Sequence, residues 1–114
     1  MKRKNKSATL TNAEDCIFVV MYDISETRTR NEVVKFLTQM GCLRIQRSVF
    51  MGNLSHAKME EIIQTLEGIY QSYENEDSYI VIPLRKENVK GMKIFSKIKD
   101  LSIILRDKPV LFFG

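Results

Sequence analysis

The side chain best placed to carry out chemistry is Asp23, a carboxylate inside the apolar run of residues 17–24. Such a run, rich in β-branched and aromatic residues, is typical of a strand that is buried on both faces. A charged group at the rim of a buried strand needs a cation, a metal ion or hydrogen-bond donors to compensate it. Arg28, Arg30 and Arg44 are near enough in the predicted pattern either to neutralise Asp23 or to bind phosphates.

One carboxylate holds magnesium poorly, because the ion needs carboxylate oxygens to replace part of its water shell. In a twofold dimer, two copies of Asp23 could share one hydrated magnesium ion and activate a water molecule against a phosphodiester. The sequence carries no Gly-rich phosphate loop, no Ser/His/Asp set and no Cys/His cluster that would offer other chemistry. The alternative interpretation makes Asp23 a structural cap on the loop that follows the strand.

The spacing of apolar residues predicts the elements that would position these side chains. Residues 43–54 are extended, as two short strands or as one strand with a bulge. Residues 92–98 have the spacing of a short helix, which Gly91 weakens. The other expected elements are a strand at 17–24, a helix from about Thr29 that ends at Gly41, a helix after the N-cap Ser55 that reaches Tyr73, a strand at 78–82, and one or two final strands within residues 103–113.

Two details of the helices are also predicted. Thr29 and Glu32 have the spacing of a capping box, although Ser25 or Thr27 could cap the helix one turn earlier. In the second helix, the methionine and the tyrosines follow the helical period and are expected in the core. These residues are Met59, Tyr70 and Tyr73.

This order of elements predicts an α+β fold, a ferredoxin-like βαββαβ sandwich. Two helices would cover one face of the sheet, and no element is left to cover the other, so we expect a homodimer. An extra C-terminal strand, with Val110 and Phe112 at the interface, would be exchanged across that homodimer. We expect residues 1–15 to be a disordered basic tail and residues 16–114 to be one domain, in which 85–114 form a basic extension with the dimerisation strand.

The net charge of +4 is unevenly distributed, since residues 85–108 hold eight basic residues against three acidic ones. This pattern favours a basic surface for nucleic acid, with ordinary solvated faces as the alternative. No apolar run is long enough to cross a membrane, so no membrane contact is expected. Cys16 and Cys42 have no metal or redox spacing and suit a reducing cytoplasm, where we expect the protein to act.

Several separated motifs occur in the order and spacing of a known family. They are Tyr22-Asp23-Ile24, Arg30-Asn31 at the start of a helix, Gly41 at its end, Arg44-Ile45-Gln46, and the stretch from Ser48 to Leu54. Together they resemble the Cas-two family, the second of the two universal CRISPR-associated adaptation proteins, over about residues 16–84.

The resemblance implies a ferredoxin-like homodimer that bridges two dimers of the Cas-one integrase. Such a homodimer clamps a double-stranded DNA protospacer during spacer acquisition. The resemblance also implies magnesium-dependent endonuclease activity on single-stranded RNA or double-stranded DNA, which not every member has. Asp23 would hold the metal, Tyr22 would be a second catalytic residue, and Arg30, Arg44 and Phe50 would support the activity. Independently of function, Tyr22 and Phe50 are expected in the core or at an interface.

One further alternative is a toxin-like, metal-dependent endoribonuclease of the same fold outside a CRISPR locus. The neighbouring genes would separate the two, because an adaptation protein stands beside an integrase gene and a repeat array. A toxin would stand beside a small antitoxin gene.

Overall fold

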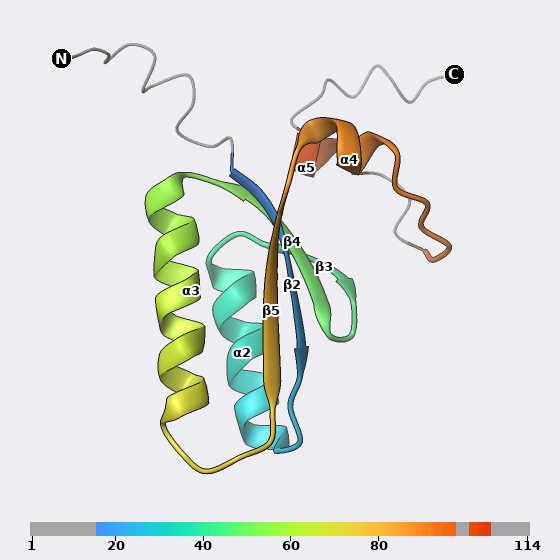
Figure 1. The fold of residues 1–114 in the computed structure, drawn as a ribbon. Helices are drawn as coiled ribbons and strands as arrows, with labels where there is room; N and C mark the ends of the chain where they lie inside the picture. Colours follow the sequence, from blue (N-terminus) through green and yellow to red (C-terminus); the bar gives the residue numbers. More distant parts are fainter. Residues whose placement is uncertain (1–15, 98–100, 106–114) are drawn as a thin grey trace, which may run out of the picture.

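The computed structural model describes residues 16–97 and 101–105. Residues 43–54 form two strands joined by a turn at Arg47 and Ser48, with a shift in pairing register between Arg44 and Gln46. Along the chain the elements are β2 (Cys16–Asp23), α2 (Thr27–Gln39), β3 (Leu43–Gln46), β4 (Val49–Leu54), α3 (His56–Gln71), β5 (Ser78–Leu84), α4 (Lys86–Lys90) and α5 (Ser102–Leu105) (Figure 1).

The four strands form one sheet in the order β3-β4-β2-β5, and every neighbouring pair is antiparallel. The helices α2 and α3 lie together on one face (Figure 1). This arrangement confirms the predicted ferredoxin-like α+β fold. In the pairing of β2 with β5, Asp23 lies opposite Ser78 and Ile17 lies opposite Leu84. Asp23 therefore marks one end of the sheet, and α4, which follows Leu84, marks the other.

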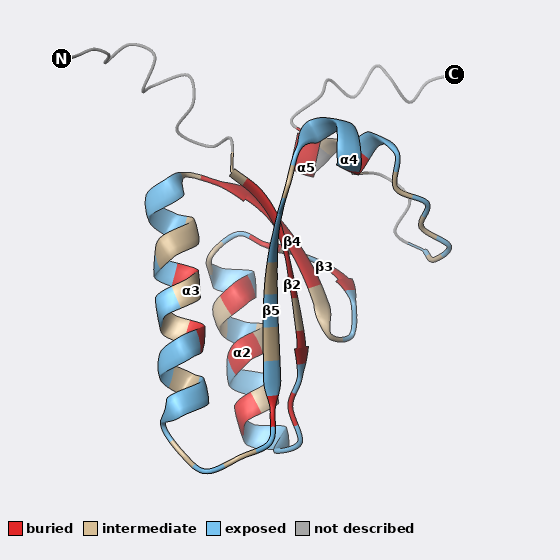
Figure 2. Ribbon diagram, in the orientation of Figure 1, coloured by how far each residue is buried: buried red, intermediate tan, exposed pale blue. Residues whose placement is uncertain are grey.

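The central strand β2 is buried on both faces, as its apolar run predicts (Figure 2). Successive side chains of a strand point to opposite faces. Phe18, Val20 and Tyr22 accordingly join the core under the helices, whereas Ile17 and Val19 join a second cluster on the other face.

The face opposite the helices is partly covered by the chain's own C-terminal segment, which corrects the expectation that no element covers it. Val89, Ile104 and Leu105 pack with Met51 and its neighbours in the second cluster. On β5, Ile80 and Ile82 pair with the second-cluster residues Met21 and Val19. They are nevertheless 50% and 37% exposed. The cover is thus incomplete.

Within the described part of the C-terminal segment, two sequence predictions are wrong. Ile104 and Leu105 lie in a helical turn, α5, and not in a strand. Both are buried, and a strand would have sent these neighbours to opposite faces. The expected helix at 92–98 is absent from the described residues 92–97, and the helix lies earlier, at Lys86–Lys90. Val110 and Phe112 are outside the described residues.

Helix α2 begins earlier than the capping box predicted. Its N-cap is Glu26, and Thr29 lies inside the helix, where its hydroxyl donates a hydrogen bond to the Glu26 carboxylate. The Thr29–Glu32 capping box is therefore wrong, because the helix already begins at Thr27 and the Thr29 hydroxyl bonds to Glu26 instead. The predicted end is confirmed: Gly41 has φ of +98°, in the left-handed region that favours glycine.

Helix α3 begins as predicted, since the Ser55 hydroxyl accepts a hydrogen bond from the Lys58 backbone N–H at 3.2 Å. Met59 is half-buried against the core, but Tyr70 is 46% exposed. Its ring meets Tyr79 edge-on, with centroids 6.1 Å apart. The core position predicted for Tyr70 is wrong, because Tyr70 borders an open hollow between α3 and β5. None of the described helices is long and apolar enough to span a membrane.

Candidate active site and nucleic-acid interface

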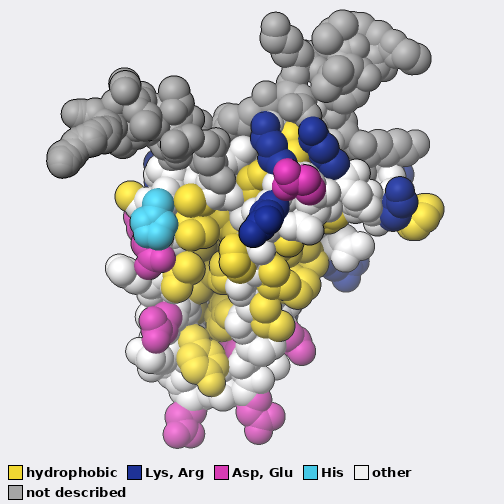
Figure 3. All heavy atoms as spheres, turned by 45° about the horizontal axis from the view of Figure 1, so that its top comes forward, with side chains coloured by type: hydrophobic (Ala, Val, Ile, Leu, Met, Phe, Trp, Pro, Cys, Tyr) yellow, Lys and Arg dark blue, Asp and Glu magenta, His cyan; other side chains and the backbone are white. Residues whose placement is uncertain are grey.

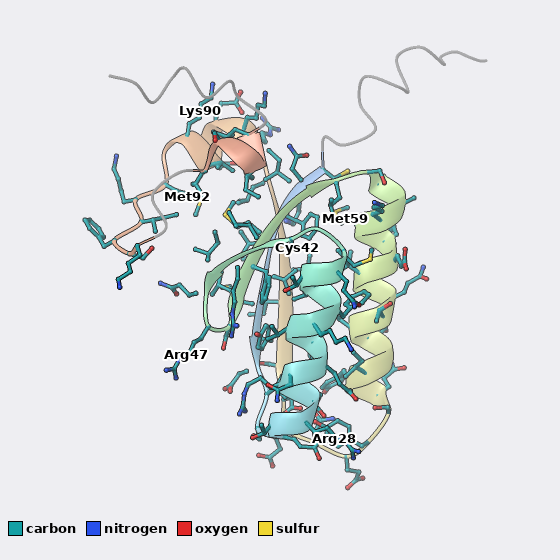
Figure 4. All side chains as sticks on the ribbon, turned by 180° about the vertical axis from the view of Figure 1, so that it is seen from behind. Arg28, Cys42, Arg47, Met59, Lys90 and Met92 are labelled. Carbon is teal, nitrogen blue, oxygen red and sulfur yellow. The ribbon has the colours of Figure 1, made fainter. Side chains whose placement is uncertain are left out.

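A polar hollow of about 570 Å³ lies at the end of the sheet where β2 stops. It brings together the predicted Asp23 from β2, Arg30 from α2 and Arg44 from β3. Arg28 is not among its lining residues and is exposed in the first turn of α2, whereas Arg47, from the β3–β4 turn, does line the hollow (Figure 4). The sequence thus located three of the residues that share this hollow.

Asp23 is exposed, although it terminates a buried strand. Within residues 16–97 and 101–105, its carboxylate takes part in no ion pair or hydrogen bond, and its charge is exposed to solvent. Neither neutralisation by Arg30 or Arg44 nor a loop cap by Asp23 is seen among these residues. The carboxylate oxygens therefore face the hollow without an internal partner there.

The arginines of the hollow are instead hydrogen-bonded to the main chain. The Arg30 guanidinium donates to the carbonyl oxygens of Ile24 at 2.8 Å and Ser25 at 3.3 Å. Arg44 donates from Nη2 to the carbonyl oxygen of Arg47 at 2.9 Å. Each guanidinium has five N–H donors, so these bonds fix its position and leave donors for a ligand.

Tyr22 lies beneath this site and is only 5% exposed. Its hydroxyl donates to the Arg47 carbonyl at 2.9 Å, and its ring stacks on Phe50 with centroids 6.4 Å apart. Burial raises the pKa of Tyr22, against the opposing effect of the nearby Arg44 and Arg30 guanidinium groups. At neutral pH the hydroxyl is protonated and holds the β3–β4 turn; a catalytic role for Tyr22 stays a prediction.

Phe50 completes a small stack under the hollow. It is fully buried, and the Arg44 guanidinium carbon lies 5.7 Å from its ring centroid. This distance is within the range of a cation–π contact. The Phe50 ring and the Arg47 carbonyl oxygen therefore both help to fix the position of the Arg44 guanidinium.

The sequence missed Asp77, which is the acid that holds the loop after β2. Its carboxylate accepts the Ser25 backbone N–H at 3.1 Å and the Tyr73 hydroxyl at 2.7 Å, and the residue is 7% exposed. In the sequence it belongs to an acidic turn, and only the pairing of Ser78 with Asp23 reveals its place. The structural cap that was considered for Asp23 is therefore supplied by Asp77.

The described residues of one chain do not form a magnesium site at the hollow. Among the lining residues Asp23 is the one acid, and the described residues contain no group of three or more His, Cys, Asp or Glu side chains able to hold a metal. Magnesium usually keeps several waters and is bound through one or two carboxylates together with substrate phosphates.

A second candidate surface, here called the basic patch, lies at the other end of the sheet. Basic side chains gather over α4 and the segment after it (Figure 3). All are exposed, none forms an ion pair with another described residue, and Glu87 is the single acid in the stretch 85–97. The basic patch consists of Arg85, Lys86, Lys90, Lys93 and Lys97.

The fold and the hollow define a small ferredoxin-like protein with a lone acid among arginines. A family model described as CRISPR associated protein Cas2 matches residues 16–92. The chain belongs to this family, which is the Cas-two family that its motifs resemble, and it has a CRISPR-associated role.

Individual relatives agree with this placement. A Synechocystis protein named CRISPR-associated endoribonuclease Cas2 3 is 35% identical over 81 residues, which cover 71% of this chain and 85% of the relative. A Methanospirillum hungatei protein named CRISPR-associated endoribonuclease Cas2 1 is 41% identical over 44 residues, or 39% of this chain and 46% of the relative. That match thus spans about half of the Methanospirillum protein.

A solved structure shows the same fold. The crystal structure of Streptococcus pyogenes Cas2 at pH 6.5 aligns with a TM-score of 0.59 and 22% identity. The alignment covers 70% of this chain and 99% of that protein. At this identity the likeness concerns the fold alone.

Proposed function

We propose that this chain is an adaptation subunit that binds double-stranded DNA as a homodimer and bridges the Cas-one integrase during spacer acquisition. The basic patch is the observation that carries the proposal. Its five cations are exposed and have no ion-pair partner within the described residues. Unpaired lysines and arginines gathered on one surface release counterions from phosphates on binding, whatever the base sequence.

The partly covered face of the sheet supports the homodimer. Ile80 and Ile82 are exposed beside a buried apolar cluster, so a second copy placed over β5 would remove both from water. The expected exchanged strand, with Val110 and Phe112, lies outside the described residues.

Salt-dependent binding tests the proposal. We expect the purified protein to bind a labelled DNA duplex with an affinity that falls steeply between about 50 and 200 mM salt. Lys90→Gln should weaken binding equally for unrelated sequences and reduce the salt slope by about 1. Lys58→Gln on α3 is the matched control, since Lys58 is also exposed and lies outside the basic patch. An equal effect of both variants would contradict the proposal.

A second candidate function is metal-dependent endonuclease activity on RNA or DNA. The hollow supports it, because the exposed Asp23 carboxylate lies among Arg30 and Arg44, and relatives carry the word endoribonuclease in their names. The metal would be magnesium held by the Asp23 residues of two copies, where it would supply an activated water. In this chain the arginines would bind the phosphate.

Substitution of Asp23 separates this activity from binding. We expect Asp23→Asn and removal of divalent metal each to abolish cleavage of RNA or DNA, with duplex affinity within about twofold of the original. Asp23→Ala should keep the fold, since the side chain is exposed. Glu32→Gln, an exposed acid on α2, serves as the charge-matched control. An Asp23→Ala protein that cleaves at the original rate would remove the nuclease proposal.

A further inference from the structure

The segment that follows α4 presents an aromatic ring between lysines. Met92 and Ile94 are half-buried against the second cluster, whereas Lys93, Phe95 and Lys97 are exposed. Phe95 is 93% exposed, so nearly all of its ring is in contact with water. The alternating burial means that the anchored residues hold the segment to the molecule while the cationic and aromatic side chains point outward. Figure 4 shows Met92 on this segment and Lys90 on the helix before it.

A small hollow lies beside the exposed ring. It has a volume of about 250 Å³ and is bordered by Phe95 and Lys93 together with apolar side chains. Its apolar walls come from Met92, Ile94 and Leu101. A flat, partly apolar group that stacked on the Phe95 ring would therefore also have an apolar wall at its edge.

The surrounding charge selects the chemistry of the ligand. Phe95 lies within the basic patch, whose cations outnumber Glu87 five to one in the stretch 85–97. An apolar pocket on a protein would match the ring but not the positive charge of Lys93 and Lys97 beside it in the chain. A nucleic acid supplies a base for the ring and phosphates for the lysines at the same time.

We propose that Phe95 stacks on an unpaired base of bound nucleic acid, with Lys93 and Lys97 on the adjoining phosphates. In a blunt duplex the bases are already stacked on each other, so a protein side chain at the duplex surface meets mainly phosphates. An overhang or single-stranded stretch exposes the face of a base, and aromatic stacking tolerates every sequence because each base has a π-face. This inference rests on the proposed nucleic-acid binding and adds to it a preference for unpaired nucleotides.

Binding of three labelled probes by the full chain tests the inference: a blunt duplex, the same duplex with a single-stranded overhang, and the single strand. Phe95→Ala should weaken binding of the overhang and the single strand by about 5- to 150-fold, the range that loss of one base–aromatic stack gives. Blunt-duplex binding should stay within about twofold, since phosphate contacts dominate it. Phe95→Tyr keeps a ring and should bind all three probes as the original protein does.

Other results would overturn the inference. An unchanged affinity of Phe95→Ala for the overhang, with duplex binding intact, rejects the stacking role and leaves the proposed function standing. If the original protein does not bind the duplex but binds the single strand, and Phe95→Ala weakens that binding, the duplex proposal is rejected and stacking is supported. A Phe95→Ala protein that dissociates into monomers in sedimentation equilibrium shows instead that the ring contacts a second copy of the chain.

Discussion

The two ends of the sheet carry positive charge in different ways. At the Asp23 end, Arg30 and Arg44 are hydrogen-bonded to main-chain carbonyls, and Arg44 also lies over the Phe50 ring. At the α4 end, lysines such as Lys90 are exposed and form no ion pair with another described residue. Guanidinium groups held in place suit a phosphate in one geometry, whereas ammonium groups on flexible stems can follow a nucleic-acid backbone in many positions.

The difference separates a built site from an adaptable surface. The hollow at Asp23 is shaped by buried residues beneath it, including Tyr22 and Phe50, and a change to these buried residues disturbs packing. In α4, Val89 is the one buried residue, and the charged side chains of the basic patch extend into water. We therefore expect substitutions of the buried or hydrogen-bonded residues at the first end to alter stability, and substitutions in the basic patch to alter affinity.

The largest effect on stability is expected at Asp77. Asp77→Ala leaves the Ser25 N–H and the Tyr73 hydroxyl without their carboxylate acceptor, and should lower the free energy of unfolding by about 2–3 kcal/mol. Asp77→Asn retains an oxygen acceptor and should cost less. Urea unfolding followed by circular dichroism measures both. Asp23→Ala is the control, and an equal loss for Asp23 and Asp77 would erase the distinction between a functional and a structural acid.

Much of the fold could be predicted from the sequence, because local patterns and the tertiary structure agree there. The apolar run of β2, the glycine with positive φ at Gly41 and the Ser55 cap each have a short-range physical cause. The segment after β5 was mispredicted because its local pattern is ambiguous. Ile104 and Leu105 suit a strand by composition, but packing against β4 selects a helical turn that buries both.

The candidate site was predictable only in part. Asp23, Arg30 and Arg44 lie close to strand and helix boundaries that the sequence reveals, so their meeting was foreseeable. The exposure of Asp23 and the role of Asp77 depend on the register of β2 against β5, which no local pattern specifies. Whether Asp23 and Tyr22 are catalytic stays a prediction.

A middle-sized effect is expected at Arg30. Arg30→Gln removes hydrogen bonds to the carbonyl groups of Ile24 and Ser25 and should lower the free energy of unfolding by about 1–2 kcal/mol. Duplex affinity at moderate salt should change less than it does for Lys90→Gln, which should in turn leave unfolding unaltered. Paired unfolding and anisotropy measurements on both variants decide the matter. The reverse pattern, with Arg30 controlling affinity and Lys90 stability, would overturn the contrast between the two ends.

The smallest effects are expected from two tyrosines. Tyr22→Phe loses the hydrogen bond to the Arg47 carbonyl and should cost about 1 kcal/mol. The buried Tyr79 hydroxyl has no hydrogen-bond partner among the described residues, so Tyr79→Phe should be neutral or slightly stabilising at pH 7. Chemical unfolding at that pH compares the two variants directly. A larger loss for Tyr79→Phe than for Tyr22→Phe would show that the hydroxyl of Tyr79 has a partner in the folded protein.

Alkaline pH sharpens the same comparison. Burial first, and then the negative charge of Asp77, raise the pKa of Tyr79 from its usual 10.0 to about 12. The unfolded chain therefore releases this proton at a lower pH than the folded chain does. The contribution of Tyr79 to the free energy of unfolding is thus fully present below pH 10 and is lost between pH 10 and about pH 12. In Tyr79→Phe the decline should be shallower, since one ionising group is gone. An identical decline in both proteins would mean that Tyr79 ionises as readily when folded as when unfolded.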